Sequence, residues 1–376
     1  MRKVIKQKYS IGGSNMWKEA EVFAVMEEKN VDAMLLSGGC IMLYFSGCSG
    51  ATGYFYISKK RQVLMTDFRY IFQAKEEVLP GITVMEPEKN YRELLRTLVR
   101  EDGVKSLAFE GMEILYNDFA LLSEYVKGEN GLPLQWVPLK EELSGLRAIK
   151  TAEEIKKIRQ AEHIGDLAFS HILNVLKPGM TELQVAAELE YAMKKNGAEG
   201  FSFDTIAASG IHSSMPHAVP TEKKLEKGEF LTMDFGCVYQ GYCSDMTRTV
   251  VIGKADEEQK KVYDAVLTAQ KKALEAIKAD VCGRDIDKVA RDYIYENGYE
   301  GCFGHGLGHS VGLFIHENPR FSPSCDDKIP EGAVITVEPG IYLENYYGVR
   351  IEDLVVVTKD GYENLTASEK KLLEIV

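Results

Sequence analysis

The sequence lacks an excess of positive charge, a cysteine framework and an uninterrupted apolar segment that would suit a membrane span. Its 57 acidic residues outnumber its 45 basic residues, which gives a formal net charge of -12. Because binding to a phosphate backbone needs a basic surface, this charge argues against a nucleic-acid partner. The seven cysteines are odd in number and show no C-x-x-C spacing. They fit buried thiols in a reducing cytoplasm better than a disulfide framework.

The longest uncharged segment covers residues 33–58 and has the length of a membrane span. Glycines and serines interrupt it, which instead predicts two short buried strands and a turn. The basic residues at positions 2–8 are not followed by an apolar region, so we expect no signal peptide. The expectation is a cytoplasmic protein without a membrane partner.

The length of 376 residues and the apolar content of 45% predict two domains with real cores, divided near residue 145. Residues 1–145 contain no histidine and no catalytic constellation. Their alternating patterns predict an α/β domain with a mixed sheet. We expect strands at 33–36, 53–58, 62–66, 82–85, 106–109 and 134–137, the second and third forming a hairpin, and helices at 16–29, 91–101 and 114–127.

Helix start signals open the second part, residues 146–376. Thr151 and Glu154 have the spacing of a capping box, and Thr181 and Gln184 repeat it. An apolar stripe follows each pair. A long helix is therefore expected to begin after Thr151 and to end before Pro178, with a second helix after Thr181.

The second part also contains an internal repeat. At one constant offset, residues 153–161 align with 257–265 and residues 228–236 align with 332–340. The latter two segments share a glycine, an apolar strand, a threonine and then an acid, which is Asp234 in the first copy and Glu338 in the second. Each copy continues to a second acid, and each strand follows a histidine in an H-x-x-P frame. These residues are Asp245 and Glu352 for the acids, and His217 and His316 for the histidines.

Two repeats that pack face to face would bring the four acids into one cleft. A single acid at a strand end is usually a surface or capping group. Two carboxylates about 4 Å apart, however, repel by roughly 4 kcal/mol at an effective dielectric near 20. Four buried carboxylates therefore need protons or cations, and two divalent ions would balance their charge.

A fifth donor is expected from the run Gly304-His305-Gly306-Leu307-Gly308-His309, whose glycines allow the backbone to approach closely. Four carboxylates and one imidazole suit manganese, or cobalt, iron or zinc, better than a thiolate-loving ion. The run lacks the Lys-Ser/Thr of a phosphate loop, and the triplet at 234–236 lacks the H-R-D loop of a kinase. The sequence identifies no partner for His163, His171 or His212.

Residues 146–376 resemble the pita-bread metallopeptidases, which include aminopeptidase P, prolidase and methionine aminopeptidase. The resemblance rests on Met233-Asp234-Phe235-Gly236, Ser244-Asp245-Met246-Thr247-Arg248-Thr249, the segment 305–312 with His316-Glu317, Val337-Glu338-Pro339-Gly340 and Arg350-Ile351-Glu352-Asp353. It implies an α+β fold, in which a C-terminal pita-bread domain with a pseudo-twofold repeat follows a smaller α/β N-terminal domain with a mixed sheet.

The same resemblance implies the roles of individual residues. The five ligands of a two-metal site would be Asp234, Asp245, His309, Glu338 and Glu352. The substrate pocket would be lined by His217, His305, His316 and Arg350. Since all five ligand positions hold the expected residue type, we expect an active enzyme.

The first part resembles the N-terminal domain of aminopeptidase P and prolidase in Tyr44-Phe45-Ser46-Gly47 and Thr66-Asp67-Phe68-Arg69-Tyr70. This likeness implies short proline-containing peptides as substrates, cleaved after the first residue, and a homodimer. His217 or His316 would donate to the oxyanion, and Glu338 would carry a proton to the leaving nitrogen. Two alternatives stay open, namely a prolidase restricted to dipeptides and, more distantly, a peptide-binding module without catalysis. A metal-free creatinase-like hydrolase is disfavoured by the complete ligand set.

Overall fold

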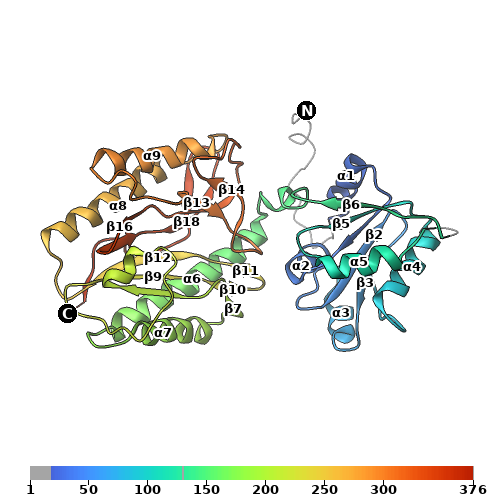
Figure 1. Ribbon diagram of the computed structural model, residues 1–376, viewed down its shortest axis with the longest axis horizontal. Helices are drawn as coiled ribbons and strands as arrows, with labels where there is room; N and C mark the ends of the chain where they lie inside the picture. The colour runs from blue at the N-terminus through green and yellow to red at the C-terminus, as the bar shows by residue number, and fades with distance from the viewer. Residues whose placement is uncertain (1–17, 129–130, 376) are drawn as a thin grey trace. The chain divides into compact units, whose positions relative to one another are not determined.

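The computed structural model describes residues 18–128 and 131–375. The chain divides into two compact units between Leu146 and Arg147 (Figure 1). The basic residues at positions 2–8, on which the expectation about a signal peptide rests, lie outside the described residues. Each unit has its own sheets and helices and is described by itself.

The N-terminal unit is built on one six-stranded sheet with the order β4-β3-β2-β1-β5-β6. The β1 strand pairs in parallel with β5 and antiparallel with β2, so the sheet is mixed, as predicted. The predicted hairpin is also present, because β2 and β3 pair antiparallel. The strands are β1 (Ala33–Leu36), β2 (Gly53–Ser58), β3 (Gln62–Thr66), β4 (Thr83–Met85), β5 (Ser106–Glu110) and β6 (Gln135–Leu139).

Two helices of this unit were not expected from the sequence. The segment between β1 and β2 forms α2 rather than a turn, and α3 follows β3. In α2 every position from Cys40 to Phe45 is apolar, so the sequence shows no periodicity that separates a helix from a strand. Gly47 ends α2 in the left-handed region at a φ of 79°. The helices are α1 (Glu19–Lys29), α2 (Gly39–Ser46), α3 (Ile71–Glu77), α4 (Tyr91–Asp102) and α5 (Tyr116–Tyr125).

The C-terminal unit carries four long helices at the places that the repeat predicts. Capping boxes open three of them, and Thr151 accepts from the backbone N–H of Glu154 as expected. The long helices are α6 (Ala152–Val175), α7 (Glu182–Lys195), α8 (Glu257–Ala276) and α9 (Gly283–Glu296), and the short 3₁₀ helices are η3 (Gly145–Arg147) and η4 (Gly210–Ser214).

Each half of this unit contains the same antiparallel arrangement of three strands. In the first half β9 lies between β8 and β12, and in the second half β15 lies between β13 and β18. The first sheet consists of β8 (Ile206–Ser209), β9 (Phe230–Phe235), β12 (Met246–Ile252) and β20 (Glu374–Ile375). The second consists of β13 (Gly308–Ser310), β14 (Glu317–Phe321), β15 (Val334–Val337), β18 (Asp353–Val357) and β19 (Tyr362–Asn364). Smaller sheets comprise β16 (Gly340–Leu343) with β17 (Tyr347–Arg350), and β7 (Gly200–Phe201) with β10 (Cys237–Tyr239) and β11 (Tyr242–Cys243).

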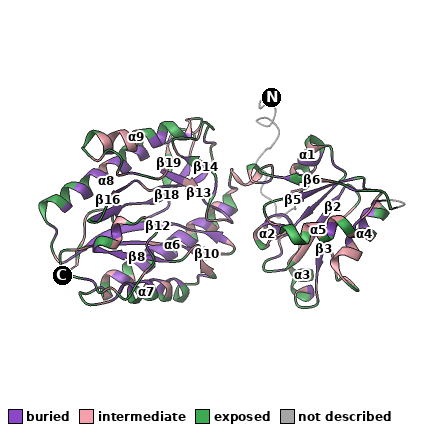
Figure 2. Cartoon of the chain, in the orientation of Figure 1, coloured by how far each residue is buried: buried purple, intermediate pink, exposed green. Residues whose placement is uncertain are grey.

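Each helix pair lies at the centre of a hydrophobic core, and the core around α8 and α9 also includes Phe230 and Val251 of the first sheet. Residues of α6 and α7 pack against β9 and β12, and residues of α8 and α9 pack against β15 and β17. Figure 2 shows the buried residues on the strands and on the helix faces that turn toward them. Removing this apolar surface from water supplies the main stabilisation of the unit. The paired helices therefore hold both sheets rigidly, which fixes the side chains at the strand ends.

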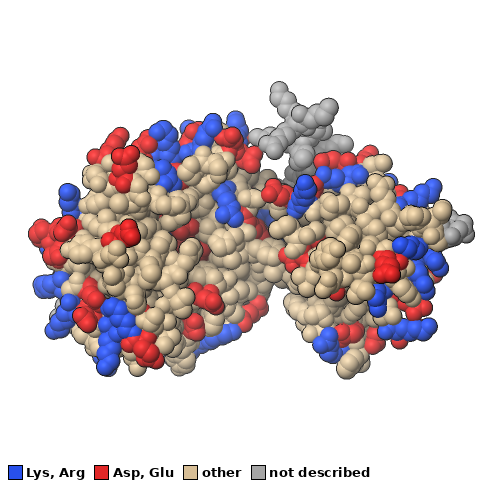
Figure 3. All heavy atoms as spheres, viewed as in Figure 1, with Lys and Arg blue, Asp and Glu red and all other residues tan. Residues whose placement is uncertain are grey.

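No described helix combines the length and the hydropathy that a membrane crossing needs. The uncharged window 33–58 contains β1, the eight-residue α2 and β2. On the face shown in Figure 3, basic side chains lie among acidic ones over both units.

Arg248 on β12 joins the two halves to the C-terminal segment. Its side chain is buried, and its guanidinium lies 2.9 Å from Asp353 Oδ1 at the start of β18. It also donates to four backbone carbonyls, namely those of Thr247, Glu352, Ser368 and Glu369. A buried cation with this many acceptors connects elements that are far apart in the sequence.

We predict that Arg248→Met lowers the free energy of unfolding by about 3–5 kcal/mol, because it leaves Asp353 Oδ1 and several carbonyls buried without their donor, while Lys370 and Asn364 reach only Oδ2. The surface pair Arg159–Glu363 offers a matched control, since both side chains are about half exposed. Arg159→Met is expected to cost less than about 1 kcal/mol. Urea unfolding followed by circular dichroism measures both, and equal losses would contradict the assigned role of Arg248.

Candidate metal centre

Antiparallel pairing places the two acids of each half at the same end of a sheet. Asp234 lies near the end of β9, and Asp245 comes directly before β12. Glu338 follows β15, and Glu352 precedes β18 in the same way. Since the end of one strand lies beside the start of its antiparallel partner, each half contributes a pair of neighbouring carboxylates.

The four acids of the two halves lie together. Oxygens of Asp234, Asp245 and Glu352 lie within 4.8 Å of one another. His309 Nε2 lies 3.5 Å from Asp245 Oδ2 and 3.4 Å from Glu338 Oε1, which adds the fourth acid and an imidazole to the group. The halves meet directly here, because Thr247 Oγ1 of β12 donates to Glu352 Oε2 at 2.8 Å.

The glycine-rich loop brings His309 into this group. A Cβ atom at Gly308 would lie 1.9 Å from the carbonyl oxygen of Thr336, so only glycine permits β13 to approach β15 here. Gly304, in contrast, has open space around it. The Ser310 carbonyl lies 3.2 Å from His309 Nδ1 and can only accept. Nδ1 therefore carries the proton, and the lone pair of Nε2 faces the carboxylates.

Burial and mutual repulsion disfavour the charged forms of these carboxylates. Desolvation raises the pKa of Asp245 well above its usual range, and the neighbouring charge of Glu352 adds to the effect. Burial likewise raises the pKa of Glu352, with Glu338 as its main charged neighbour. Burial also raises the pKa of Glu338 to about 8. Burial lowers the pKa of His309 to about 3, so its imidazole is neutral at pH 7.

These groups fit divalent cations. Two buried oxygens, Asp234 Oδ1 and Glu352 Oε1, accept no hydrogen bond from any described residue. Buried polar atoms normally have partners, so such atoms point to a missing ligand. Carboxylate oxygens and a neutral imidazole are ligands of manganese, zinc, cobalt and iron, and positive charge would relieve the repulsion that raises the carboxyl pKa values.

Arg350 connects the acids to a chain of polar side chains. Its guanidinium is buried, lies 2.6 Å from Asp234 Oδ2 and donates to the hydroxyl of Tyr342 at 2.8 Å. Tyr342 in turn lies 2.9 Å from His305 Nε2. Burial and the positive charge of Arg350 lower the pKa of His305 to about 4. The chain therefore holds His305 neutral and fixes its ring.

The three predicted pocket histidines lie near one another. His217 is exposed on the loop after η4 and is an electrostatic neighbour of both His305 and His316. The His316 ring lies 4.4 Å from that of His309, between ring centroids. Burial lowers the pKa of His316. These side chains come from three different loops. His316 contacts His309 directly, and His305 is connected to Asp234 through Tyr342 and Arg350.

Several residues of this region were missed by the sequence analysis. Tyr342 follows Glu338 by four residues, and its place in the polar chain has no local signal. Arg320 is exposed on β14, paired in register with His309, and its charge acts on His309, His316 and Glu338. Burial alternates along β14, which puts Arg320 on its exposed face, and the residue types of this strand show no such alternation. His212 has a partner, since its Nδ1 lies 3.0 Å from Glu182.

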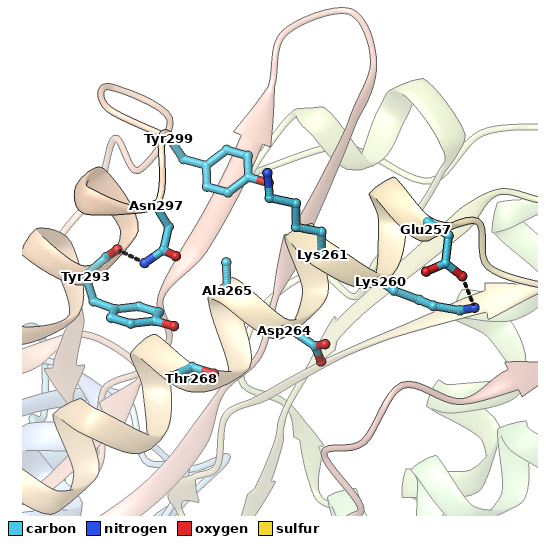
Figure 4. A pocket seen from close by; sticks show the side chains of 9 residues that line it. All are labelled: Glu257, Lys260, Lys261, Asp264, Ala265, Thr268, Tyr293, Asn297 and Tyr299. Carbon is cyan, nitrogen blue, oxygen red and sulfur yellow. Dashed lines mark hydrogen bonds and ion pairs between the residues drawn. The ribbon is translucent and has the colours of Figure 1, made fainter.

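A surface pocket of about 460 Å³ lies between α8 and α9 (Figure 4). Its lining includes the pair Lys260–Glu257, whose charged atoms are 2.8 Å apart. None of the predicted site residues lines it. Because no histidine and no cluster of carboxylates is among its lining residues, this pocket offers no comparable chemistry.

Comparison with known protein families shows to which family the chain belongs. Residues 156–359 match the metallopeptidase family M24, and residues 20–149 match the creatinase/prolidase N-terminal domain. The chain belongs to metallopeptidase family M24. The first match includes all the predicted ligands, and the second covers most of the N-terminal unit and extends three residues beyond it. Membership confirms the predicted pita-bread fold and the prediction that the chain is a metallopeptidase.

Relatives in the family match the chain over nearly its whole length. An Xaa-Pro dipeptidase of Pyrococcus horikoshii is 38% identical over 358 residues, which is 95% of this chain and 98% of the relative. The solved Xaa-Pro dipeptidase of Bacillus anthracis has a TM-score of 0.90 at 39% identity and covers 94% of this chain and 98% of its own. The solved X-Pro aminopeptidase of Thermotoga maritima has a TM-score of 0.87 at 38% identity, covering 93% and 100%.

We predict that Asp245→Asn weakens binding of Mn²⁺ by at least about tenfold, because it removes a charge and an oxygen donor. The metal-free variant is expected to be more stable than the metal-free parent, by roughly 1–3 kcal/mol, since one of the repelling carboxylates is gone. Isothermal titration and thermal unfolding measure the two effects. Asp264→Asn, on the exposed face of α8, is the matched control. Unchanged Mn²⁺ affinity in Asp245→Asn would contradict the metal centre.

Proposed function

We propose that the chain is an exopeptidase that uses two divalent metal ions to hydrolyse the Xaa-Pro bond at the N-terminus of short peptides. The observation that carries this proposal is the enclosure of four carboxylates and His309 in one place, with oxygens of Asp234 and Glu352 that no described residue satisfies. Relatives that are named Xaa-Pro dipeptidase or X-Pro aminopeptidase align over more than nine tenths of the chain, which supports the choice of substrate.

The ions would be held by Asp234, Asp245, His309, Glu338 and Glu352, and we propose manganese, with cobalt, zinc and iron as alternatives. When bound, such ions supply a nucleophile from water at neutral pH and polarise the scissile carbonyl. Two of these ligands are oriented by neighbouring side chains: Glu352 by Thr247 and Asp234 by Arg350. Thr336 Oγ1 donates to Glu338 Oε1 at 3.1 Å, which holds that carboxylate by one oxygen.

The remaining roles belong to side chains that surround the acids. We assign donation to the developing oxyanion to His217 or His316, because the His316 ring lies against that of His309 and His217 is an electrostatic neighbour of His316. We assign the transfer of a proton to the leaving nitrogen to Glu338, because it lies beside His309 and only its Oε1 accepts a hydrogen bond from a described residue. His305 and Arg350 would shape the pocket through Tyr342.

A proline nitrogen has no hydrogen in the peptide bond, so the enzyme cannot recognise the substrate through that donor. Recognition would instead depend on the ring and on the free N-terminus, whose positive charge an acidic cleft attracts. We also propose the domain division 1–145 and 146–376, a homodimer and a cytoplasmic location. These proposals rest on the sequence patterns and on the family resemblance.

A second candidate function is a prolidase restricted to dipeptides, and Arg320 favours it. In an Xaa-Pro dipeptide the free carboxylate is on the proline itself, next to the bond that breaks. The exposed guanidinium of Arg320 is an electrostatic neighbour of His309, His316 and Glu338, so it lies within reach of a carboxylate at that distance. In a tripeptide the carboxylate lies about 3.5 Å farther along the chain. Arg320 would therefore bind the carboxylate of the dipeptide more strongly than that of the tripeptide.

Removal of metal tests the main proposal. We expect thorough chelation to abolish hydrolysis of an Xaa-Pro dipeptide, and addition of Mn²⁺ to restore it. An Xaa-Ala dipeptide serves as the substrate control and should be cleaved far more slowly throughout. Release of the free C-terminal amino acid, proline or alanine, is the measurement, combined with metal analysis of the same sample. Hydrolysis that persists after the metal content falls below detection would refute the mechanism.

Arg320→Met tests the choice between the two functions. If Arg320 binds the carboxylate of proline, kcat/KM for an Xaa-Pro dipeptide falls by about tenfold or more, as expected for a lost hydrogen bond to a charged group. The same substitution should change kcat/KM for an Xaa-Pro-Xaa tripeptide by less than about threefold. Equal losses on both substrates would argue against the dipeptidase.

A further inference from the structure

The two loops that carry His217 and His305 are each tied to the second helix of their own half. The first, residues 210–220, connects β8 to the segment before β9. The second, residues 303–307, leads from α9 into β13. In each half a buried carboxylate of that helix accepts hydrogen bonds from the loop: Glu182 from α7 and Asp287 from α9. Neither carboxylate belongs to the group around His309.

Glu182 closes the 210–220 loop at both ends. Its side chain is fully buried, and Oε1 accepts from the backbone N–H and the hydroxyl of Ser209, each at 2.8 Å. Oε2 accepts from the hydroxyl of Thr221 at 2.7 Å and from its N–H at 3.1 Å. His212 Nδ1 lies 3.0 Å from both oxygens. One carboxylate therefore satisfies donors on the residues immediately before and after the loop.

The middle of the loop is exposed. His217 and the apolar side chains of Ile211, Met215 and Val219 all face solvent. Ser213 provides the other fixed point, because its hydroxyl accepts from the N–H of Gly348 at 2.9 Å. The position of His217 beside His305 and His316 thus depends on where the loop begins and ends, which Glu182 sets.

Asp287 acts in a related way in the second half, together with Arg291 one turn later on α9. Asp287 Oδ1 accepts from the N–H of Leu307 at 2.9 Å, and its carboxylate pairs with Arg291 through two contacts of 2.7 and 2.9 Å. Arg291 also donates to the carbonyls of Phe303 and His305, both at 2.7 Å. Both ends of the 303–307 loop are therefore held by the pair.

We propose that Glu182 and Asp287 are positioning residues, which fix His217 and His305 respectively for the reaction. The inference rests on the proposed function, in which these histidines line the substrate pocket. In Glu182→Gln the NH₂ group must face a backbone N–H, that of Ser209 or of Thr221. In Asp287→Asn it must face either the N–H of Leu307 or the side chain of Arg291, so in neither variant can all the bonds form. A displacement of about 1 Å in a reacting group can cost about a hundredfold in rate.

Double-mutant cycles test the assignment. Glu182→Gln is combined with His217→Ala, and Asp287→Asn with His305→Ala. We expect each anchor variant alone to lower kcat/KM for an Xaa-Pro dipeptide by about tenfold to a hundredfold. In the background that lacks its own histidine, the same change should cost less than about twofold. In the crossed pairs, such as Glu182→Gln with His305→Ala, the full loss should persist.

Two surface acids on the same helices are matched controls. Glu188 on α7 pairs with His171, and Asp292 on α9 pairs with Lys288, with their side chains 41% and 48% exposed. Glu188→Gln and Asp292→Asn should leave kcat/KM unchanged. A milder variant, Thr221→Val, removes one donor and leaves Glu182 in place, so it tests the first loop if Glu182→Gln does not fold.

Hydrogen exchange gives a readout that does not depend on activity. In Glu182→Gln or Thr221→Val we expect faster amide exchange confined to residues 209–221, with the metal content unchanged. Exchange that rises evenly over α7 and β8, or an undiminished loss of kcat/KM in the His217→Ala background, would overturn the inference. If the parent protein does not cleave Xaa-Pro substrates, the proposed function fails. The exchange result still decides whether Glu182 holds the loop.

Discussion

The structure depends on keeping four carboxylates close together away from water. Asp245, Glu338 and Glu352 each have a raised pKa because burial and their neighbours disfavour charge. A pair of such groups about 4 Å apart repels by roughly 4 kcal/mol at an effective dielectric near 20. The surrounding fold has to resist this repulsion, and the buried Arg350 offsets only the charge of Asp234 in direct contact. The repulsion among the four carboxylates therefore both destabilises the fold and favours the binding of cations between them.

The duplicated architecture explains how this arrangement is held. Each half supplies one antiparallel pair of strands with two acids at one end, and the helix pair of each half packs in a hydrophobic core. The halves then meet through short polar contacts, above all those of Thr247 and Arg248 with the start of β18. The ends of rigid strands carry the proposed ligands, whereas loops carry the proposed pocket histidines His217, His305 and His316. This division suits a site in which ions need fixed geometry and substrates need access.

Much of the fold could be predicted because short segments of the sequence contain the signals for its helices and strands. Thr151 and Thr181 mark helix starts through their capping boxes, and the repeat aligned both acid-bearing strands. The helix α2 was interpreted as a turn because a uniformly apolar run carries no period, and the short α3 has no distinct start signal. The candidate site was predicted from the internal repeat, which gives each half two acids at equivalent positions. The contacts of Tyr342, Arg320 and Glu182 did not, because they join segments that no local pattern relates.

The central claim is that these residues form a centre for two cations, and anomalous scattering from crystals grown with Mn²⁺ tests it most directly. The account predicts two manganese peaks per chain, with Asp234, Asp245, His309, Glu338 and Glu352 as their protein ligands. Peaks confined to surface acids, or an acid group that stays free of metal at saturating Mn²⁺, would contradict it.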